Sequence, residues 1–213
     1  MAEYVLHCFP ESGGCYKAAL MLALCDADWR GQPVDYHAAE QRTPEWRAAH
    51  NEMGEVPVLE HGAVSLTQSG VILHYLAEQT GRFGADSPEE AREILRWILF
   101  DNHKFTSYFA TYRWLHSFTP DADPQVKAAF RSRALGAFAI VEQHLAGRDF
   151  ILGARPTIAD ISMVGYHFFP PEETGFDLPA THPNIAAWLG RISALPGWRP
   201  AYDLLPGKRW PRG

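Results

Sequence analysis

Strand-like segments are confined to the first third of the chain, and this asymmetry limits the fold more than any other feature of the sequence. Between residues 4 and 66, short runs rich in β-branched and aromatic residues alternate with helical patterns. After residue 87 no convincing strand follows. A chain of 213 residues is long enough for two small domains. The pattern therefore predicts an α/β domain followed by an all-helical domain.

The first 79 residues predict the element order βαβ-αββα. The expected elements are a strand over 4–9, a glycine turn at 13–14, a helix over 15–25, a strand over 33–36, a short helix capped by Thr43, strands over 55–60 and 63–66, and a helix over 70–80 capped by Ser69. The two later strands form an antiparallel hairpin. This order is too short and too mixed for a doubly wound dinucleotide fold.

A polar, glycine-rich stretch over residues 80–87 separates two regions of different character. We therefore expect one domain over 1–79, a linker over 80–87 and an all-α domain over 88–213. A capping box at Ser87 opens a long helix to about Trp114. A second helix from Pro124 is expected to turn its apolar residues inward, namely Val126, Phe130, Phe138, Val141 and Leu145. Two further helices are expected over 157–170 and 184–195.

Composition and charge exclude several classes of partner. The net charge is −6 and no run of Lys or Arg is long enough to follow a series of phosphates, so we expect no nucleic acid partner. No apolar run of membrane-spanning or signal length occurs, which predicts a cytoplasmic protein with no membrane partner. Three cysteines in such a chain predict free thiols rather than a disulfide framework.

Three motifs, in this order and at these separations, resemble the cytosolic glutathione transferase superfamily. The run Glu55-Val56-Pro57-Val58-Leu59 looks like the strand-entry motif whose proline follows a cis peptide. The pair Gln68-Ser69 looks like the start of the helix that binds the γ-glutamyl group. The run 150–153 with Thr157-Ile158-Ala159-Asp160 resembles the structural capping box of the helical domain, which assigns Thr157 and Asp160 to folding.

The resemblance implies a thioredoxin-like N-terminal domain that binds glutathione, and a C-terminal all-helical domain that contributes the site for an apolar electrophile. Residues 12–17, Ser-Gly-Gly-Cys-Tyr-Lys, resemble the active-site loop of the serine-type classes: theta, delta and related bacterial forms. The implied activity is conjugation of the glutathione thiolate to a small apolar electrophile, with glutathione as co-substrate. The family also implies a homodimer.

Two residues compete for the catalytic role, because a thiol of pKa ~8.5 is mostly protonated at neutral pH. Ser12 stands at the start of a helix, where its hydroxyl and the helix dipole would both stabilise a thiolate. Cys15 lies in the first helical turn, where thiol pKa values tend to fall. Cys15 would instead indicate a glutathione-dependent disulfide or peroxide reductase. A non-catalytic glutathione-binding protein is a third hypothesis.

The resemblance also assigns the residues that hold glutathione. Val56, ahead of Pro57, offers its backbone to the cysteinyl part, and Gln68 and Ser69 suit the γ-glutamyl carboxylate. In the family the residue before Val-Pro is often basic or an amide, whereas this chain has Glu55. Gln41 or Arg42 is therefore the candidate for the glycine carboxylate.

The electrophile site is expected to be lined by aromatic and apolar residues from both domains. The candidates are Phe9, Pro10, His103, Tyr108, Tyr112 and Tyr166. No two of the ten histidines lie within ten positions of each other, so the sequence predicts no metal site.

Overall fold

The computed structural model describes residues 2–210, which form two compact units. Unit 1 contains residues up to Arg82 together with Pro196–Trp210, and unit 2 contains Phe83–Leu195. Within residues 2–210, no helix combines the length and the apolar character that a membrane crossing requires.

Unit 1 is built on a four-stranded sheet in the order β2-β1-β3-β4. The strands are β1 (Tyr4–Cys8), β2 (Trp29–Pro33), β3 (Val58–His61) and β4 (Val64–Thr67). β1 pairs parallel with β2 and antiparallel with β3, and β3 pairs antiparallel with β4. The mixed sheet confirms the predicted α/β character of this part.

The second strand is not where the sequence analysis expected it. β2 runs over Trp29–Pro33 rather than 33–36. It lies at the edge of the sheet, and most of its side chains are at least partly exposed, so it carries no apolar pattern. Of the run taken for this strand, only Val34 belongs to a buried cluster, with Trp46 and Val58.

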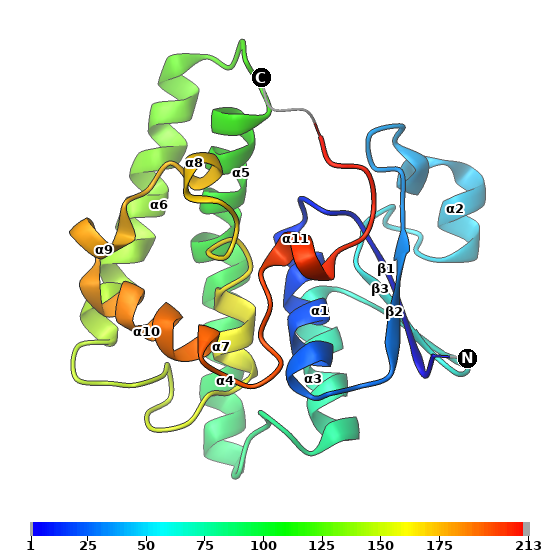
Figure 1. Cartoon of the computed structure of the whole chain (residues 1–213), viewed down its shortest axis with the longest axis horizontal. Helices are drawn as coiled ribbons and strands as arrows, with labels where there is room; N and C mark the ends of the chain where they lie inside the picture. Colours follow the sequence, from blue (N-terminus) through cyan, green and yellow to red (C-terminus); the bar gives the residue numbers. More distant parts are fainter. Residues whose placement is uncertain (1, 211–213) are drawn as a thin grey trace. The chain divides into compact units, whose positions relative to one another are not determined.

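Helices cover both faces of the sheet in unit 1 (Figure 1). α1 (Gly13–Leu24) and α3 (Ser69–Thr80) lie on one side, and α2 (Pro44–Ala49) lies on the other, after a 3-10 turn, η1 (Glu40–Arg42). Ten of the twelve residues of α1 are buried, which explains why its apolar residues occupy several faces. A last helix, α11 (Ala201–Leu204), packs against α1.

Two helix starts differ from the expectation. Gly13 and Gly14 are the first residues of α1 rather than a preceding turn, and Ser12 is the N-cap. Ser69 is the first residue of α3 rather than its cap. Gln68 holds the N-cap position of α3 without a side-chain hydrogen bond to the helix. The predicted cap of α2 is confirmed, since Thr43 accepts the Trp46 N–H.

Unit 2 is helical, as predicted, with one isolated bridge between Phe150 and Gly153. Its helices are α4 (Pro88–Phe100), the π-helical turn η2 (Asp101–Phe105), α5 (Thr106–Ser117), α6 (Pro124–His144), α7 (Ile158–Met163), α8 (Pro171–Thr174), α9 (Leu178–Thr181) and α10 (Pro183–Ser193). The long helix expected over 88–114 is thus a succession of α4, η2 and α5. The helix capped at Thr157 ends at Met163, earlier than expected.

Residues at the start of α6 do not face inward as expected. Val126 is 44% exposed and Phe130 is half-buried. The buried face begins one to two turns later, at Ala134, Ala137, Phe138 and Val141.

Asp160 organises the helical unit through four hydrogen bonds. Its carboxylate accepts the backbone N–H of Thr157 at 2.8 Å and of Ile151 at 2.8 Å, the Thr157 hydroxyl at 3.2 Å and the Trp188 indole N–H at 2.9 Å. Thr157 Oγ1 in turn accepts the Ala159 N–H, which completes the predicted capping box. The box therefore also anchors the 150–153 turn and α10.

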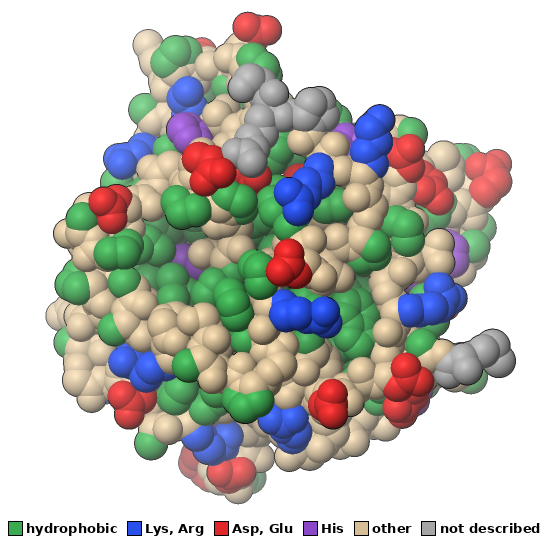
Figure 2. All heavy atoms as spheres, viewed as in Figure 1, with side chains coloured by type: hydrophobic (Ala, Val, Ile, Leu, Met, Phe, Trp, Pro, Cys, Tyr) green, Lys and Arg blue, Asp and Glu red, His purple; other side chains and the backbone are tan. Residues whose placement is uncertain are grey.

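Charged side chains of both signs are interspersed on the face of the molecule shown in Figure 2. Positive side chains on this face stand singly, near acidic ones.

Candidate functional site

The first turn of α1 presents a hydroxyl at the positive end of a helix. Ser12 has extended backbone angles, φ −82 and ψ 113, and its Oγ accepts the Cys15 N–H at 3.0 Å. That bond uses the oxygen as acceptor, and the hydroxyl retains a proton that it can donate. Ser12 is 6% exposed, so little bulk water competes for that proton. The site is therefore suited to stabilising an anion.

The strand entry lies next to this hydroxyl. The Val56–Pro57 peptide is cis, as the resemblance implied. A Cβ built on Gly14 would stand 3.5 Å from Pro57 Cδ and 3.7 Å from Ser12 Oγ. Ser12 and Pro57 therefore border the same small space, and Val56, which is half-buried, directly precedes Pro57.

The start of α3 brings together two residues that the sequence analysis treated separately. Gln68 Nε2 donates to Glu55 Oε2 at 3.0 Å. Both side chains are exposed, and the Ser69 that follows opens α3. Glu55 thus lies beside a helix N-terminus, where a carboxylate and unpaired backbone N–H groups stand close together.

Gln68 also has a strained backbone. Its φ is 66 and its ψ is 114, a combination that non-glycine residues rarely adopt. Such a conformation costs of order 1–3 kcal/mol and tends to occur at ligand sites.

The two candidates for the glycine carboxylate differ in exposure. Gln41 is 2% exposed, and its Oε1 makes no hydrogen bond within residues 2–210. Arg42, the next residue in η1, is exposed. Of these two residues, only Arg42 is both charged and accessible to an incoming anion.

Cys15 is enclosed by the core. It is 0% exposed, and burial raises the pKa of its thiol to about 12, against smaller opposing effects of the Ser12 hydroxyl and the Phe9 backbone. Burial likewise raises the pKa of Cys8. Both thiols are therefore protonated at neutral pH.

The C-terminal segment of unit 1 borders the loop before Ser12, which sequence reasoning missed. A Cβ built on Gly207 would stand 3.1 Å from Pro10 Cδ, and the Trp210 N–H donates to Glu11 Oε1 at 2.7 Å. Phe9 stacks on Tyr36, with ring centroids 4.0 Å apart. These partners are far apart in the sequence, so only the fold reveals them.

The other electrophile-site candidates lie in unit 2, in different surroundings. His103 is exposed in η2, and Tyr108 is half-buried with Arg133 over its ring at 5.7 Å. Tyr112 is 4% exposed and packs on Phe176 at 5.0 Å, which makes it part of the core of unit 2. Tyr166, half-buried, lies 6.2 Å from the Phe109 ring.

Comparisons with known proteins agree over both parts of the chain. Residues 6–78 match the model of the glutathione S-transferase N-terminal domain, and residues 124–191 match that of the C-terminal domain. A glutathione S-transferase structure from Pseudomonas fluorescens has a TM-score of 0.87 and 29% identity, over 95% of this chain and all of the other.

Two curated relatives show the same likeness. Maleylacetoacetate isomerase of Rhizobium meliloti is 32% identical over 76% of this chain and 79% of its own. Glutathione S-transferase F14 of Arabidopsis thaliana is 29% identical over 78% of this chain and 69% of its own. With both domain models matched in order and relatives of this identity covering most of its length, the chain belongs to the glutathione S-transferase superfamily.

Proposed function

We propose that this protein conjugates the thiolate of glutathione to small apolar electrophiles, with the Ser12 hydroxyl stabilising the thiolate. The observation that carries the proposal is the position of Ser12, a nearly buried donor at the N-terminus of a 12-residue helix and beside Pro57. Lowering a thiol pKa by two units needs about 2.7 kcal/mol. A hydrogen bond to an anion and the helix dipole together supply energies of that size.

The remaining residues suit a tripeptide. Val56 would offer its backbone to the cysteinyl part, in the manner of strand addition. The N-terminus of α3 at Ser69 would receive the γ-glutamyl carboxylate. Glu55, held beside it by Gln68, would pair with the γ-glutamyl ammonium group rather than repel the glycine carboxylate. Arg42, the exposed cation, would take the glycine carboxylate.

A glutathione-dependent reductase that uses Cys15 is the rival proposal. The burial of Cys15 and its raised thiol pKa favour Ser12, because thiol exchange needs an accessible thiolate. Assays with an aryl halide, with a glutathione mixed disulfide and with maleylacetoacetate, the last suggested by the relative from Rhizobium meliloti, separate the candidate reactions. Glutathione binding without any turnover would instead support a non-catalytic protein.

We also propose a homodimer. Val71 on α3 is 51% exposed, and Leu95 and Leu99 on α4 are 46% and 59% exposed, which places apolar side chains in water on each helix. Sedimentation at micromolar concentration should give twice the 23.9 kDa chain mass. A single species of chain mass would refute this part of the proposal.

A further inference from the structure

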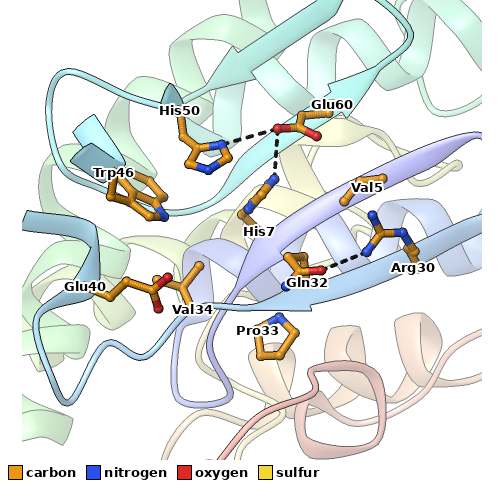
Figure 3. A pocket seen from close by; sticks show the side chains of 10 residues that line it. All are labelled: Val5, His7, Arg30, Gln32, Pro33, Val34, Glu40, Trp46, His50 and Glu60. Carbon is orange, nitrogen blue, oxygen red and sulfur yellow. Dashed lines mark hydrogen bonds and ion pairs between the residues drawn. The ribbon is translucent and has the colours of Figure 1, made fainter. Parts of the chain in front are cut away.

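The sheet of unit 1 carries a pocket of about 290 Å³ beside α2 (Figure 3). The residues that line it are Val5, His7, Arg30, Gln32, Pro33, Val34, Glu40, Trp46, His50 and Glu60. Strand register explains the arrangement: Val5 pairs with Glu60 and His7 with Val58, so His7 and Glu60 are diagonal neighbours on one face. None of these residues belongs to the proposed glutathione site.

Two imidazoles in this pocket converge on one carboxylate. His7 Nε2 lies 2.9 Å from Glu60 Oε1, and His50 Nδ1 lies 3.4 Å from the same oxygen. The two rings are 4.5 Å apart, and Figure 3 shows both directed at Glu60. One ligand atom from each of the three side chains lies within 4.8 Å of the other two.

Hydrogen bonds do not provide a partner for every buried nitrogen of this cluster. His50 Nδ1 is shielded from solvent and makes no hydrogen bond within residues 2–210. An imidazole nitrogen that is buried without a hydrogen bond is a candidate ligand for a metal ion.

Two of the three ligand spacings are close to those of a metal site, and the third, between the two imidazole nitrogens, is within 4.8 Å. With Zn–N and Zn–O bonds of about 2.1 Å, two ligands at a tetrahedral angle are about 3.4 Å apart. His50 and Glu60 already have that separation, and His7 needs to move from Glu60 by a fraction of an ångström. The charged groups facing the cluster are the Glu40 carboxylate and the Arg30 guanidinium, whose Nη1 donates to Gln32 Oε1 at 2.8 Å.

We propose that His7, His50 and Glu60 bind one divalent transition-metal ion, and that Zn²⁺ suits this set of two imidazoles and one carboxylate. Three protein ligands in an open pocket leave the fourth position to water. His7 is on β1, Glu60 is on β3 and His50 is the C-cap of α2. The ion would therefore link the C-terminal end of α2 to strands β1 and β3.

Calorimetric titration of metal-free, tag-free protein with zinc chloride tests this inference. We expect saturable binding of one ion per chain, and a higher midpoint of thermal unfolding with zinc, because an ion that binds only the folded state stabilises it. Glu60→Gln and His50→Gln should each weaken zinc binding by about 10- to 100-fold, as losses around metal sites do. His74→Gln, a histidine on α3 outside the cluster, should bind zinc as the wild type does.

The readout needs neither glutathione nor turnover, so it is independent of the proposed conjugation. Circular dichroism without zinc checks that each variant folds, and Glu60→Gln keeps an amide oxygen able to accept from His7. The Co²⁺ derivative should show nitrogen and oxygen ligation without thiolate charge-transfer absorption, which distinguishes the cluster from the three cysteines. Absence of saturable zinc uptake, equal affinity of all variants, or a thiolate spectrum would overturn the proposal.

Discussion

Replacing Ser12 with alanine removes two interactions of different size. The hydroxyl oxygen caps α1 by accepting the Cys15 N–H, and loss of such a cap costs ~1 kcal/mol of stability. If the hydroxyl also donates to the glutathione sulfur, its loss should lower turnover with an aryl halide by ~10²-fold, the effect of removing one preorganised donor. Glutathione affinity should change little, because in the proposed site Val56, Gln68 and Ser69 would hold the rest of the tripeptide.

Cys15→Ala provides the comparison. With a pKa of about 12, only about 10⁻⁵ of this thiol is ionised at pH 7. Its replacement should cost about 1 kcal/mol of packing and leave turnover within about two-fold. The assay is steady-state conjugation at saturating glutathione, measured from pH 5.5 to 9, with thermal unfolding of each variant in parallel.

The pH profile separates the chemical role of Ser12 from a structural one. Ser12→Ala should move the apparent pKa of bound glutathione toward the free thiol value of ~8.5, whereas a variant that is only less stable would keep the wild-type profile. An active Ser12→Ala with an unchanged profile would refute the reasoning. So would an inactive Cys15→Ala, or a mixed disulfide between Cys15 and glutathione during turnover.

Three further predictions concern stability. Asp160→Ala should cost roughly 3–9 kcal/mol by chemical denaturation, because it leaves the donors of Ile151, Thr157 and Trp188 buried without an acceptor, at about 1–3 kcal/mol each. A loss below 1 kcal/mol would contradict this. Thr157→Ala should cost about 1–2 kcal/mol, with conjugation unchanged, since it loses the cap of the Ala159 N–H and one of the four hydrogen bonds to Asp160. Gln68→Gly should raise the free energy of unfolding by about 1 kcal/mol, because glycine adopts the positive φ without strain. The same change should weaken glutathione binding, because it removes the Gln68 side chain. Lower stability of this variant would show that the Gln68 backbone is not strained.

The sequence predicts the two-part architecture because hydrophobic period and capping are local properties. The strand pattern ends with the hairpin before α3, and the boxes at Ser87 and Thr157 mark helix starts that the structure confirms. β2 was misplaced because an edge strand such as Trp29–Pro33 has no apolar face to detect. Val126 was misjudged because helical spacing does not say where along a helix the packing begins.

Parts of the candidate site depend on contacts that no local pattern encodes. The Gln68–Glu55 hydrogen bond spans 13 residues and shifts the interpretation of Glu55 from the glycine end of glutathione to the γ-glutamyl end. His7 and His50 meet only because sheet register and the end of α2 bring them together. Spacing along the chain detects ligands within one segment, so it could not reveal this cluster.

The return of Pro196–Trp210 to unit 1 has a consequence for biosynthesis. Tyr16, in α1, donates to the Arg199 carbonyl at 2.9 Å, and the site where a Gly197 Cβ would stand is 2.4 Å from the Ala23 carbonyl oxygen, which leaves room for glycine alone. The ribosome releases residues 1–82 before the segment Pro196–Trp210 has been synthesised. Although domains of nascent chains usually fold in order from the N-terminus, unit 1 can complete its packing only after residues 196–210 have been synthesised.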